Sequence, residues 1–363
     1  MTEIFLIIFF ISVLLFFLGS GIWVAISMIG VSTIGMMLFT SRPVGDAMAT
    51  TIWGTSSSWT LTALPLFVWM GEILFRTKLS ENLFAGLSPW MQKLPGGLIH
   101  VNVVGCALFA AISGSSAATV ATVGKMSIPE LRKRKYPEKI LLGSLAGSGT
   151  LGLLIPPSII LIIYGVTVQE SIAKLFIAGI IPGIMIALIF MSYVMIWSLI
   201  NKKSMPKYVE NFSFLEKIRK SKQLLPVIIL ISAVIGSIYT GVATATEAAS
   251  LGVVGALILS YFQKSLTIET FKQSLLGATK TSCMIAFILA GSTFLSLAMG
   301  FTGLPRNLAI WIQNMELSPY VLIFVLMIFY IILGMFLDGI SAVVLTMAII
   351  EPMIRQAGFD MIW

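Results

Sequence analysis

Residues 112–125 read ISGSSAATVATVGK, and residues 149–158 read GTLGLLIPPS. Both stretches place small, hydroxyl-bearing or helix-breaking residues between apolar flanks. Irregular backbone persists at membrane depth only where protein buries it or where it lines a watery cavity, because an unsatisfied amide or carbonyl in lipid costs several kcal/mol. The two stretches together therefore predict a binding site within a bilayer.

The composition indicates that the chain lies in a bilayer. Of 363 residues, 58% are hydrophobic and 10% are charged, whereas soluble domains carry about 25% charged residues. The mean hydropathy is +1.00. A membrane-crossing helix needs about 20 residues, so about nine to eleven spans fit. Residues 4–39 are too long for one crossing and contain Gly19-Ser-Gly21, so two helices are expected there. We predict an all-α polytopic membrane protein.

Positive charge is concentrated in two windows. Residues 125–139 hold six basic and two acidic side chains, and residues 201–223 hold seven basic and two acidic side chains. The two windows together carry a charge of +9, so the rest of the chain has a net charge of −1 and the whole chain a formal charge of +8. By the positive-inside rule both windows face the cytoplasm, and the intervening loop, residues 165–171, is extracytoplasmic. The basic balance does not indicate nucleic-acid binding, because neither an aromatic-interleaved basic face nor a soluble domain accompanies it.

The polar window divides the chain. The helical spacing of its apolar residues predicts that residues 201–223 form a cytoplasmic amphipathic connector. The connector separates a first half, residues 1–200, from a second half, residues 224–363.

Short motifs recur between the halves. LSENL at 79–83 returns as LPRNL at 304–308, SGSSA at 113–117 as DGISA at 338–342, and IPE at 128–130 as IEP at 350–352, at offsets of 225, 225 and 222. The near-constant offset predicts an internal repeat. An internal repeat whose segments are interrupted by glycine or proline indicates a secondary transporter. The offset puts the counterpart of the prolines 156 and 157 at about position 380. Since the chain ends at Trp363, we expect the second repeat to be truncated at the C-terminus.

The two quoted stretches have complementary chemistry. Ser113 to Ser116 has poor helix propensity, and small residues let the arms of a hairpin pack closely while hydroxyls occupy freed backbone groups. The prolines 156 and 157 remove two donors, which frees the carbonyls of residues 152–155 for a hard cation such as Na⁺. A helix starting near Ser158 would offer its positive end to an anionic substrate. A packing face and a proline kink are the competing structural explanations.

Two acidic residues invite both structural and functional interpretations. Asp338 occupies the hairpin position of the second half, where a buried charge is costly and usually functional; helix capping is the alternative. Glu247 follows Thr244 by three residues, the spacing of a capping box. An enzyme is disfavoured, because His100 has no nearby acidic partner, no hydrolase or P-loop motif is present, and Ser115 would lack a base.

Four motifs resemble the large membrane subunit of the tripartite ATP-independent periplasmic (TRAP) transporters. They are FAAISGSSAATVATVG at 109–124, GTLGLLIPPS at 149–158 with Tyr164-Gly165, LFIAGIIPG at 175–183, and ATEAASLGVVG at 245–255. The resemblance implies a Na⁺-driven importer of organic acids, such as C4-dicarboxylates, sialic acid or related sugar acids, in a bacterial or archaeal inner membrane. It implies two partners, a small four-helix membrane subunit and a soluble extracytoplasmic substrate-binding protein. It further implies an inverted-repeat, elevator-type fold with re-entrant hairpins and broken helices.

Site residues follow from the resemblance by position. It implies Na⁺ binding, mainly by backbone carbonyls, at Ser113, Gly114, Gly149, Thr150, Gly152 and Gly339. It implies substrate binding at Ser115, Ser116, Pro157, Ser158, Asp338 and Ser341. Two other functions are open from the sequence: a self-sufficient Na⁺/carboxylate symporter, and a non-transporting, truncated membrane protein.

Overall fold

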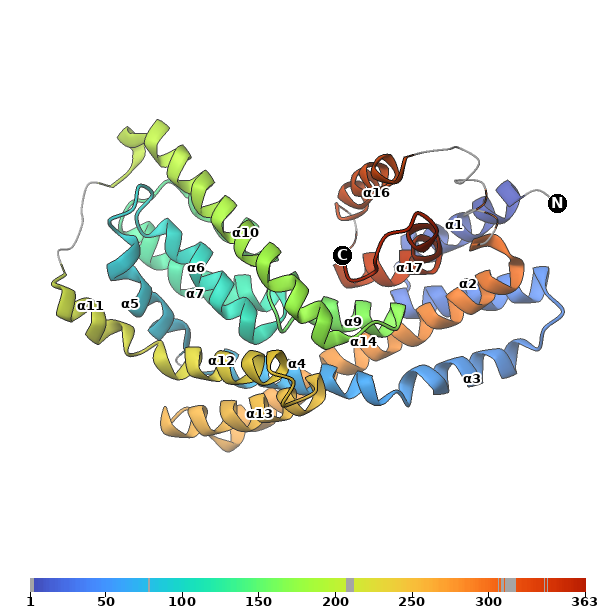
Figure 1. The fold of residues 1–363 in the computed structure, drawn as a ribbon, viewed down its shortest axis with the longest axis horizontal. Helices are drawn as coiled ribbons and strands as arrows, with labels where there is room; N and C mark the ends of the chain where they lie inside the picture. The colour runs from blue at the N-terminus through green and yellow to red at the C-terminus, as the bar shows by residue number, and fades with distance from the viewer. Residues whose placement is uncertain are drawn as a thin grey trace. The chain divides into compact units, whose positions relative to one another are not determined.

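A computed structural model of the chain describes residues 3–77, 79–206, 212–305, 307, 310, 318–335, 337 and 339–363. Over these residues the secondary structure is helical and includes no strand (Figure 1). The first half contains α1 (Glu3–Gly19), α2 (Val24–Phe39), α3 (Val44–Ser56), η1 (Trp59–Thr62), α4 (Ala63–Phe75), α5 (Leu79–Met91), α6 (Ile99–Ser113), α7 (Ser116–Lys133), α8 (Glu138–Gly149), η2 (Thr150–Leu153), α9 (Ile159–Val168) and α10 (Ile172–Ile200). The remainder contains η3 (Lys202–Ser204), α11 (Phe214–Ser221), α12 (Leu225–Tyr239), α13 (Ala245–Phe262), α14 (Ile268–Thr302), α16 (Pro319–Leu333) and α17 (Gly339–Gln356).

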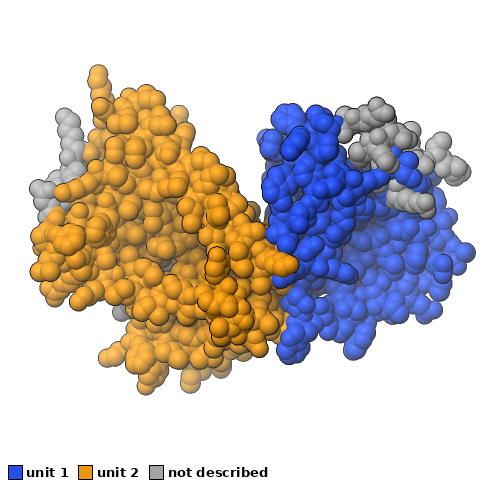
Figure 2. All heavy atoms as spheres, in the orientation of Figure 1, with its two compact units in different colours: residues 1–61, 163–171, 282–363 blue, residues 62–162, 172–281 orange. Residues whose placement is uncertain are grey.

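The chain forms two compact units (Figure 2). Unit 1 comprises Met1–Leu61, Ile163–Ser171 and Ser282–Trp363, and unit 2 comprises Thr62–Ile162 and Ile172–Thr281. Each unit draws on both halves of the sequence, because packing groups helices by proximity rather than by repeat. The division into halves at residues 201–223 stays a prediction.

Apolar helices dominate both units. Among the described residues, α10, α13, α14 and α17 are each long and apolar enough to cross a bilayer alone. The number rises to six if α3 with η1 and α4, and α11 with α12, each count as one interrupted span. These helices make the chain a multi-pass membrane protein, while the expected nine to eleven spans stay a prediction.

The apolar N-terminal stretch forms two helices, as predicted. Helix α1 ends at Gly19, and α2 begins at Val24. Gly21 between them has a φ of +76°, a conformation that glycine adopts at little steric cost. The glycine-rich break therefore turns the chain where the sequence indicated.

Two helix pairs have matching arms. The first pair, α6 and α7, has 15 and 18 residues, and the second pair, α16 and α17, also has 15 and 18. The longer arm carries an internal proline in both pairs, Pro129 in α7 and Pro352 in α17, at the fourteenth residue of the helix. The correspondence is one of helix length and proline position, and the internal repeat itself stays a prediction.

Helix α4 packs on α13 in unit 2 and also supports the first hairpin. Small residues of α13, among them Ala248 and Gly252, are buried and let the helices approach closely. On α4, a Cβ added to Gly71 would lie 3.0 Å from the Cα of Ser113. The backbone of α4 therefore fixes the end of α6 from one side.

The predicted amphipathic connector contains helix α11. Ser213 and Glu216 form a capping box at its start. Phe214 and Leu215 are 69% and 78% exposed, and the ammonium group of Lys217 lies 5.3 Å from the Trp90 ring centroid. Helix α11 bends by 55° into α12. A helix is present within the predicted connector, while an amphipathic connector over residues 201–223 and its cytoplasmic location stay predictions.

The capping box predicted at Glu247 is also present. The Thr244 hydroxyl accepts from the Glu247 N–H at 3.3 Å, and the Glu247 carboxylate accepts from the Thr244 N–H at 2.8 Å. We expect Thr244→Ala to lower the free energy of unfolding by about 1 kcal/mol, measured by thermal unfolding in detergent. Ser250→Ala is the control, because its exposed hydroxyl donates only to Thr246 within the same helix. Equal losses in both variants would contradict a specific capping role.

Candidate site at the hairpin and the broken helix

The first hairpin turns where the sequence predicted. Helix α6 ends at Ser113, and Gly114 adopts the left-handed conformation at φ +58°, which a residue with a side chain rarely adopts. Ser115 is the N-cap of α7, and its hydroxyl accepts from the Ala118 N–H at 3.4 Å. We call residues 113–116 the hairpin tip. Helices α6 and α7 pack side by side (Figure 1).

Hydroxyl groups order the tip from inside. The Thr119 hydroxyl donates to the Ser115 carbonyl at 2.7 Å and lies 3.0 Å from the Ser113 hydroxyl. Thr119 is fully buried, and Ser113 is nearly so. The hydroxyls therefore satisfy backbone groups that the break between α6 and α7 releases.

The second stretch is a broken helix. Helix α8 ends at Gly149, one 3₁₀ turn follows, and α9 begins at Ile159. Pro156 and Pro157 carry no N–H, so the carbonyls of Gly152 and Leu153 lose the donor four residues ahead. The Ser158 hydroxyl donates to the Leu153 carbonyl at 2.6 Å. The break is confirmed, but Leu153, one of the carbonyls expected to be free, has a side-chain donor.

The structure brings the hairpin tip and the broken segment together. The Ile159 N–H donates to the Gly114 carbonyl at 3.2 Å. A Cβ on Gly152 would lie 2.9 Å from both the Ser115 carbonyl carbon and the Ser116 nitrogen, and one on Gly114 would lie 2.7 Å from the Pro157 carbonyl oxygen. The two breaks therefore meet backbone to backbone, a contact that only glycine permits.

Not every predicted residue takes part equally. Gly149 is buried against Val120 of α7, and Ser158 is fully buried. Thr150 is exposed, and its hydroxyl donates to the Gly147 carbonyl at 2.7 Å. The Thr150 side chain therefore has a structural hydrogen bond, and only its backbone fits the predicted ion-binding role.

The residues predicted in the second hairpin lie in unit 1, whereas the first hairpin lies in unit 2. Gly339 and Ser341 form the first turn of α17, and Ser341 is buried. The Ser292 hydroxyl of α14 donates to the Val344 carbonyl of α17 at 2.6 Å, which holds this helix in place. Asp338 lies outside the described residues.

Two buried hydroxyls near the first hairpin were not selected from the sequence. Ser148 on α8 and Thr122 on α7 are almost completely buried, and neither oxygen has a hydrogen-bond partner among the described residues. A buried unsatisfied hydroxyl in a native structure calls for an explanation, such as an ion or an ordered water. The only feature of the sequence that could have indicated Ser148 is its position between two glycines, Gly147 and Gly149.

The groups at this site that could coordinate an ion are carbonyl and hydroxyl oxygens. Among the described residues, no group of three or more His, Cys, Asp or Glu side chains comes together. Oxygen donors suit hard cations, and the start of a helix suits an anion. The oxygen atoms that suit a cation and the helix starts that suit an anion lie next to each other here, since α7 begins at Ser116 and α9 begins at Ile159.

An all-helical membrane protein with a helical hairpin closed on a broken helix has the features of a membrane transport protein rather than of a soluble enzyme. Comparison with known sequences identifies the family. The profile of the tripartite ATP-independent periplasmic transporter family, DctM component, matches residues 10–363. The chain therefore belongs to this family and is a large permease subunit of a TRAP transporter.

Similar proteins carry matching names. The chain is 32% identical to a C4-dicarboxylate TRAP transporter large permease of Pseudomonas aeruginosa, over 90% of this chain and 75% of that protein. It is 30% identical to a sialic acid TRAP transporter large permease of Vibrio cholerae, over 94% of this chain and 80% of that protein. It is 29% identical to the isethionate TRAP transporter permease DctMQ of Oleidesulfovibrio alaskensis, over 95% of this chain and 54% of that protein.

Proposed function

We propose that the chain is the permease subunit of a Na⁺-driven, binding-protein-dependent importer of organic acids. It would lie in the cytoplasmic membrane with a small four-helix subunit and receive substrate from a soluble extracytoplasmic binding protein. C4-dicarboxylates and sialic acid, which appear in the names of its relatives, are the first candidate substrates.

The observation that carries this proposal is the backbone contact between the hairpin tip and Gly152. In the proposal, oxygens at Ser113, Gly149 and Gly152 take part in holding Na⁺, with Thr150 contributing its backbone. The Gly114 carbonyl already accepts from Ile159, so Gly114 would act through its backbone conformation in this state. The unpartnered hydroxyls of Ser148 and Thr122 are further candidate donors.

The anionic substrate would lie at the helix starts. Ser115 and Ser116 open α7, and Pro157 and Ser158 precede α9, so both N-terminal dipoles favour a carboxylate. In unit 1, Asp338 and Ser341 of the second hairpin have the corresponding proposed role in substrate binding, and Gly339 the corresponding role in binding Na⁺.

In the proposal, the two hairpins are equivalent parts of inverted repeats that move as an elevator, and the equal lengths of α6 and α16 and of α7 and α17 support the equivalence. Helix α7 ends at Lys133, in the window predicted to be cytoplasmic. Helix α17 ends near Arg355, which donates to the Val168 carbonyl at 3.2 Å and lies 3.9 Å from the Glu170 carboxylate, in the loop predicted to be extracytoplasmic. Equivalent helices would therefore end on opposite sides of the membrane.

Reconstitution tests the proposal. We would place the permease and its small subunit in proteoliposomes, impose a Na⁺ gradient, and measure uptake of labelled succinate and sialic acid with and without the binding protein. Uptake that requires both the gradient and the binding protein is expected. Uptake without the binding protein would favour a self-sufficient symporter. No uptake from the complete complex would contradict a transport function.

A further inference from the structure

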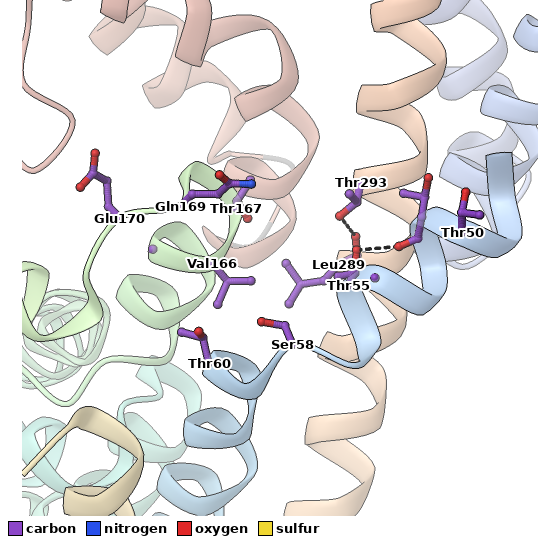
Figure 3. Close-up of a pocket in the computed structure, with 13 residues that line it drawn as sticks. Thr50, Thr55, Ser58, Thr60, Val166, Thr167, Gln169, Glu170, Leu289 and Thr293 are labelled. Carbon is purple, nitrogen blue, oxygen red and sulfur yellow. Dashed lines mark hydrogen bonds between the residues drawn. The ribbon is translucent and has the colours of Figure 1, made fainter.

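Unit 1 contains a cavity of about 550 Å³ that is separate in sequence from the hairpin site (Figure 3). Its walls come from α3 and the residues that follow it, from the end of α9 and the loop after it, and from α14. Seven of the thirteen lining residues carry a hydroxyl group, among them Thr50, Thr51 and Thr55 from α3, Thr167 from the end of α9, and Thr293 from α14. The positive-inside prediction places residues 165–171 on the extracytoplasmic side. The predicted loop is shorter in the structure, because α9 continues to Val168 and α10 begins at Ile172.

The lining threonines present acceptors to the cavity. Three of them donate the hydroxyl proton to a carbonyl of their own helix: Thr51 to Ala47 at 2.7 Å, Thr55 to Thr51 at 3.0 Å, and Thr293 to Leu289 at 2.8 Å. Because a hydroxyl has one proton and two lone pairs, the oxygens retain acceptor capacity. These three threonines therefore favour a ligand that donates hydrogen bonds.

The charge of the lining also favours a ligand that donates hydrogen bonds. Glu170 contributes a carboxylate, and among the described lining residues there is no Lys, Arg or His. Arg355, 3.9 Å from Glu170, also pairs with Glu351 at 3.0 Å, so the three side chains together carry a net charge of −1. A bare carboxylate gains little here, because no cationic side chain among the described lining residues can pair with it.

The cavity has the size of a small organic molecule. Ligand pockets typically enclose about 300–1,000 Å³, whereas a partly dehydrated cation needs oxygens at about 2–3 Å on all sides. The observed volume of about 550 Å³ therefore fits an organic solute better than a single ion.

We propose that this cavity is an extracytoplasmic subsite for the hydroxyl-bearing part of a hydroxylated organic acid. It makes the permease prefer hydroxy acids and sugar acids over unsubstituted dicarboxylates. The inference rests on the proposed transport of organic acids and names the substrate class within it. The threonine oxygens accept from the hydroxyls of the substrate, and Gln169 can also donate from its amide.

Tartrate and succinate provide a matched pair of probes, because they share a carbon chain and both carboxylates and differ only in hydroxyl groups. We would measure their binding to the full chain in lipid nanodiscs by calorimetry. Tartrate is expected to bind more tightly than succinate. Thr55→Val and Thr293→Val, which keep the side-chain shape, are each expected to weaken tartrate binding about fivefold and leave succinate binding unchanged.

Control variants separate this effect from misfolding. Thr279→Val lies on the same helix as Thr293 and removes the same kind of bond, to Leu275 at 2.8 Å, but lies outside the cavity, so tartrate binding should be unchanged. Thr293→Ser retains the hydroxyl and should restore the preference for tartrate.

The outcomes distinguish this subsite from the proposed function itself. Equal binding of tartrate and succinate to the unmodified chain, or equal loss of both in Thr55→Val, would overturn the subsite. If Na⁺-driven succinate uptake persists in that case, the transport function stands without it. If the complete complex transports neither acid, the transport function fails.

Discussion

Alanine at position 152 is expected to reduce Na⁺-driven uptake about tenfold or more. The added Cβ would lie 2.9 Å from the Ser115 carbonyl carbon and the Ser116 nitrogen, and neither backbone atom can rotate away as a flexible side chain could. The hairpin tip must then shift relative to the broken segment. Overpacking of this kind costs about 1–3 kcal/mol, so the free energy of unfolding should fall as well. Initial uptake rates and thermal unfolding measure the two effects.

Gly143→Ala is the matched control for this substitution. Gly143 lies on α8, the helix that leads to the break, and a Cβ there meets no atom within 4 Å. Alanine in an exposed helix is more favourable than glycine by about 1 kcal/mol, so this variant should be equally or more stable and should transport normally. If Gly152→Ala transports as well as Gly143→Ala does, the tip contact is not needed for function.

Local features of this site could be predicted from residue type. The left-handed Gly114 and the missing N–H groups of Pro156 and Pro157 interrupt helices wherever they occur, so both breaks were visible in the sequence. The capping boxes at Thr244 and Ser213 follow from side-chain spacing in the same way. These features depend on residues only a few positions apart.

Contacts between distant segments could not be predicted in this way. The approach of Gly152 to the hairpin tip depends on how α8 packs against α6 and α7. The donation from Ser158 to the Leu153 carbonyl depends on the path of the chain through the break. The cavity in unit 1 arises because Thr55 on α3 and Thr293 on α14 meet in the folded chain. Each of these threonines alone has the pattern of an ordinary helical residue that bonds to its own turn.

The buried hydroxyl of Ser148 allows a test in which the effect of Ser148→Ala on the free energy of unfolding is expected to change sign when Na⁺ is added. Without a partner, such a hydroxyl costs about 1–3 kcal/mol, so Ser148→Ala should be as stable as the unmodified chain, or more stable, in Na⁺-free buffer. If the hydroxyl helps to bind Na⁺, the same variant should lose much of the stabilisation by Na⁺. That stabilisation is about 2.7 kcal/mol at a concentration of 100 times the Kd. Thermal unfolding across a Na⁺ titration, with choline as the replacement cation, gives both values.

Ser144 provides the comparison one turn earlier on the same helix. It is also buried, but its hydroxyl accepts from the Asn102 amide at 3.0 Å and donates to the Leu141 carbonyl at 3.0 Å. Ser144→Ala should therefore lower stability by about 1–3 kcal/mol both with and without Na⁺, because it removes a partner from a buried amide. Two serines on one helix should thus respond to the same substitution with different signs in Na⁺-free buffer. If Ser148→Ala is destabilised equally in both buffers, its hydroxyl has a structural partner and does not contribute to an ion site.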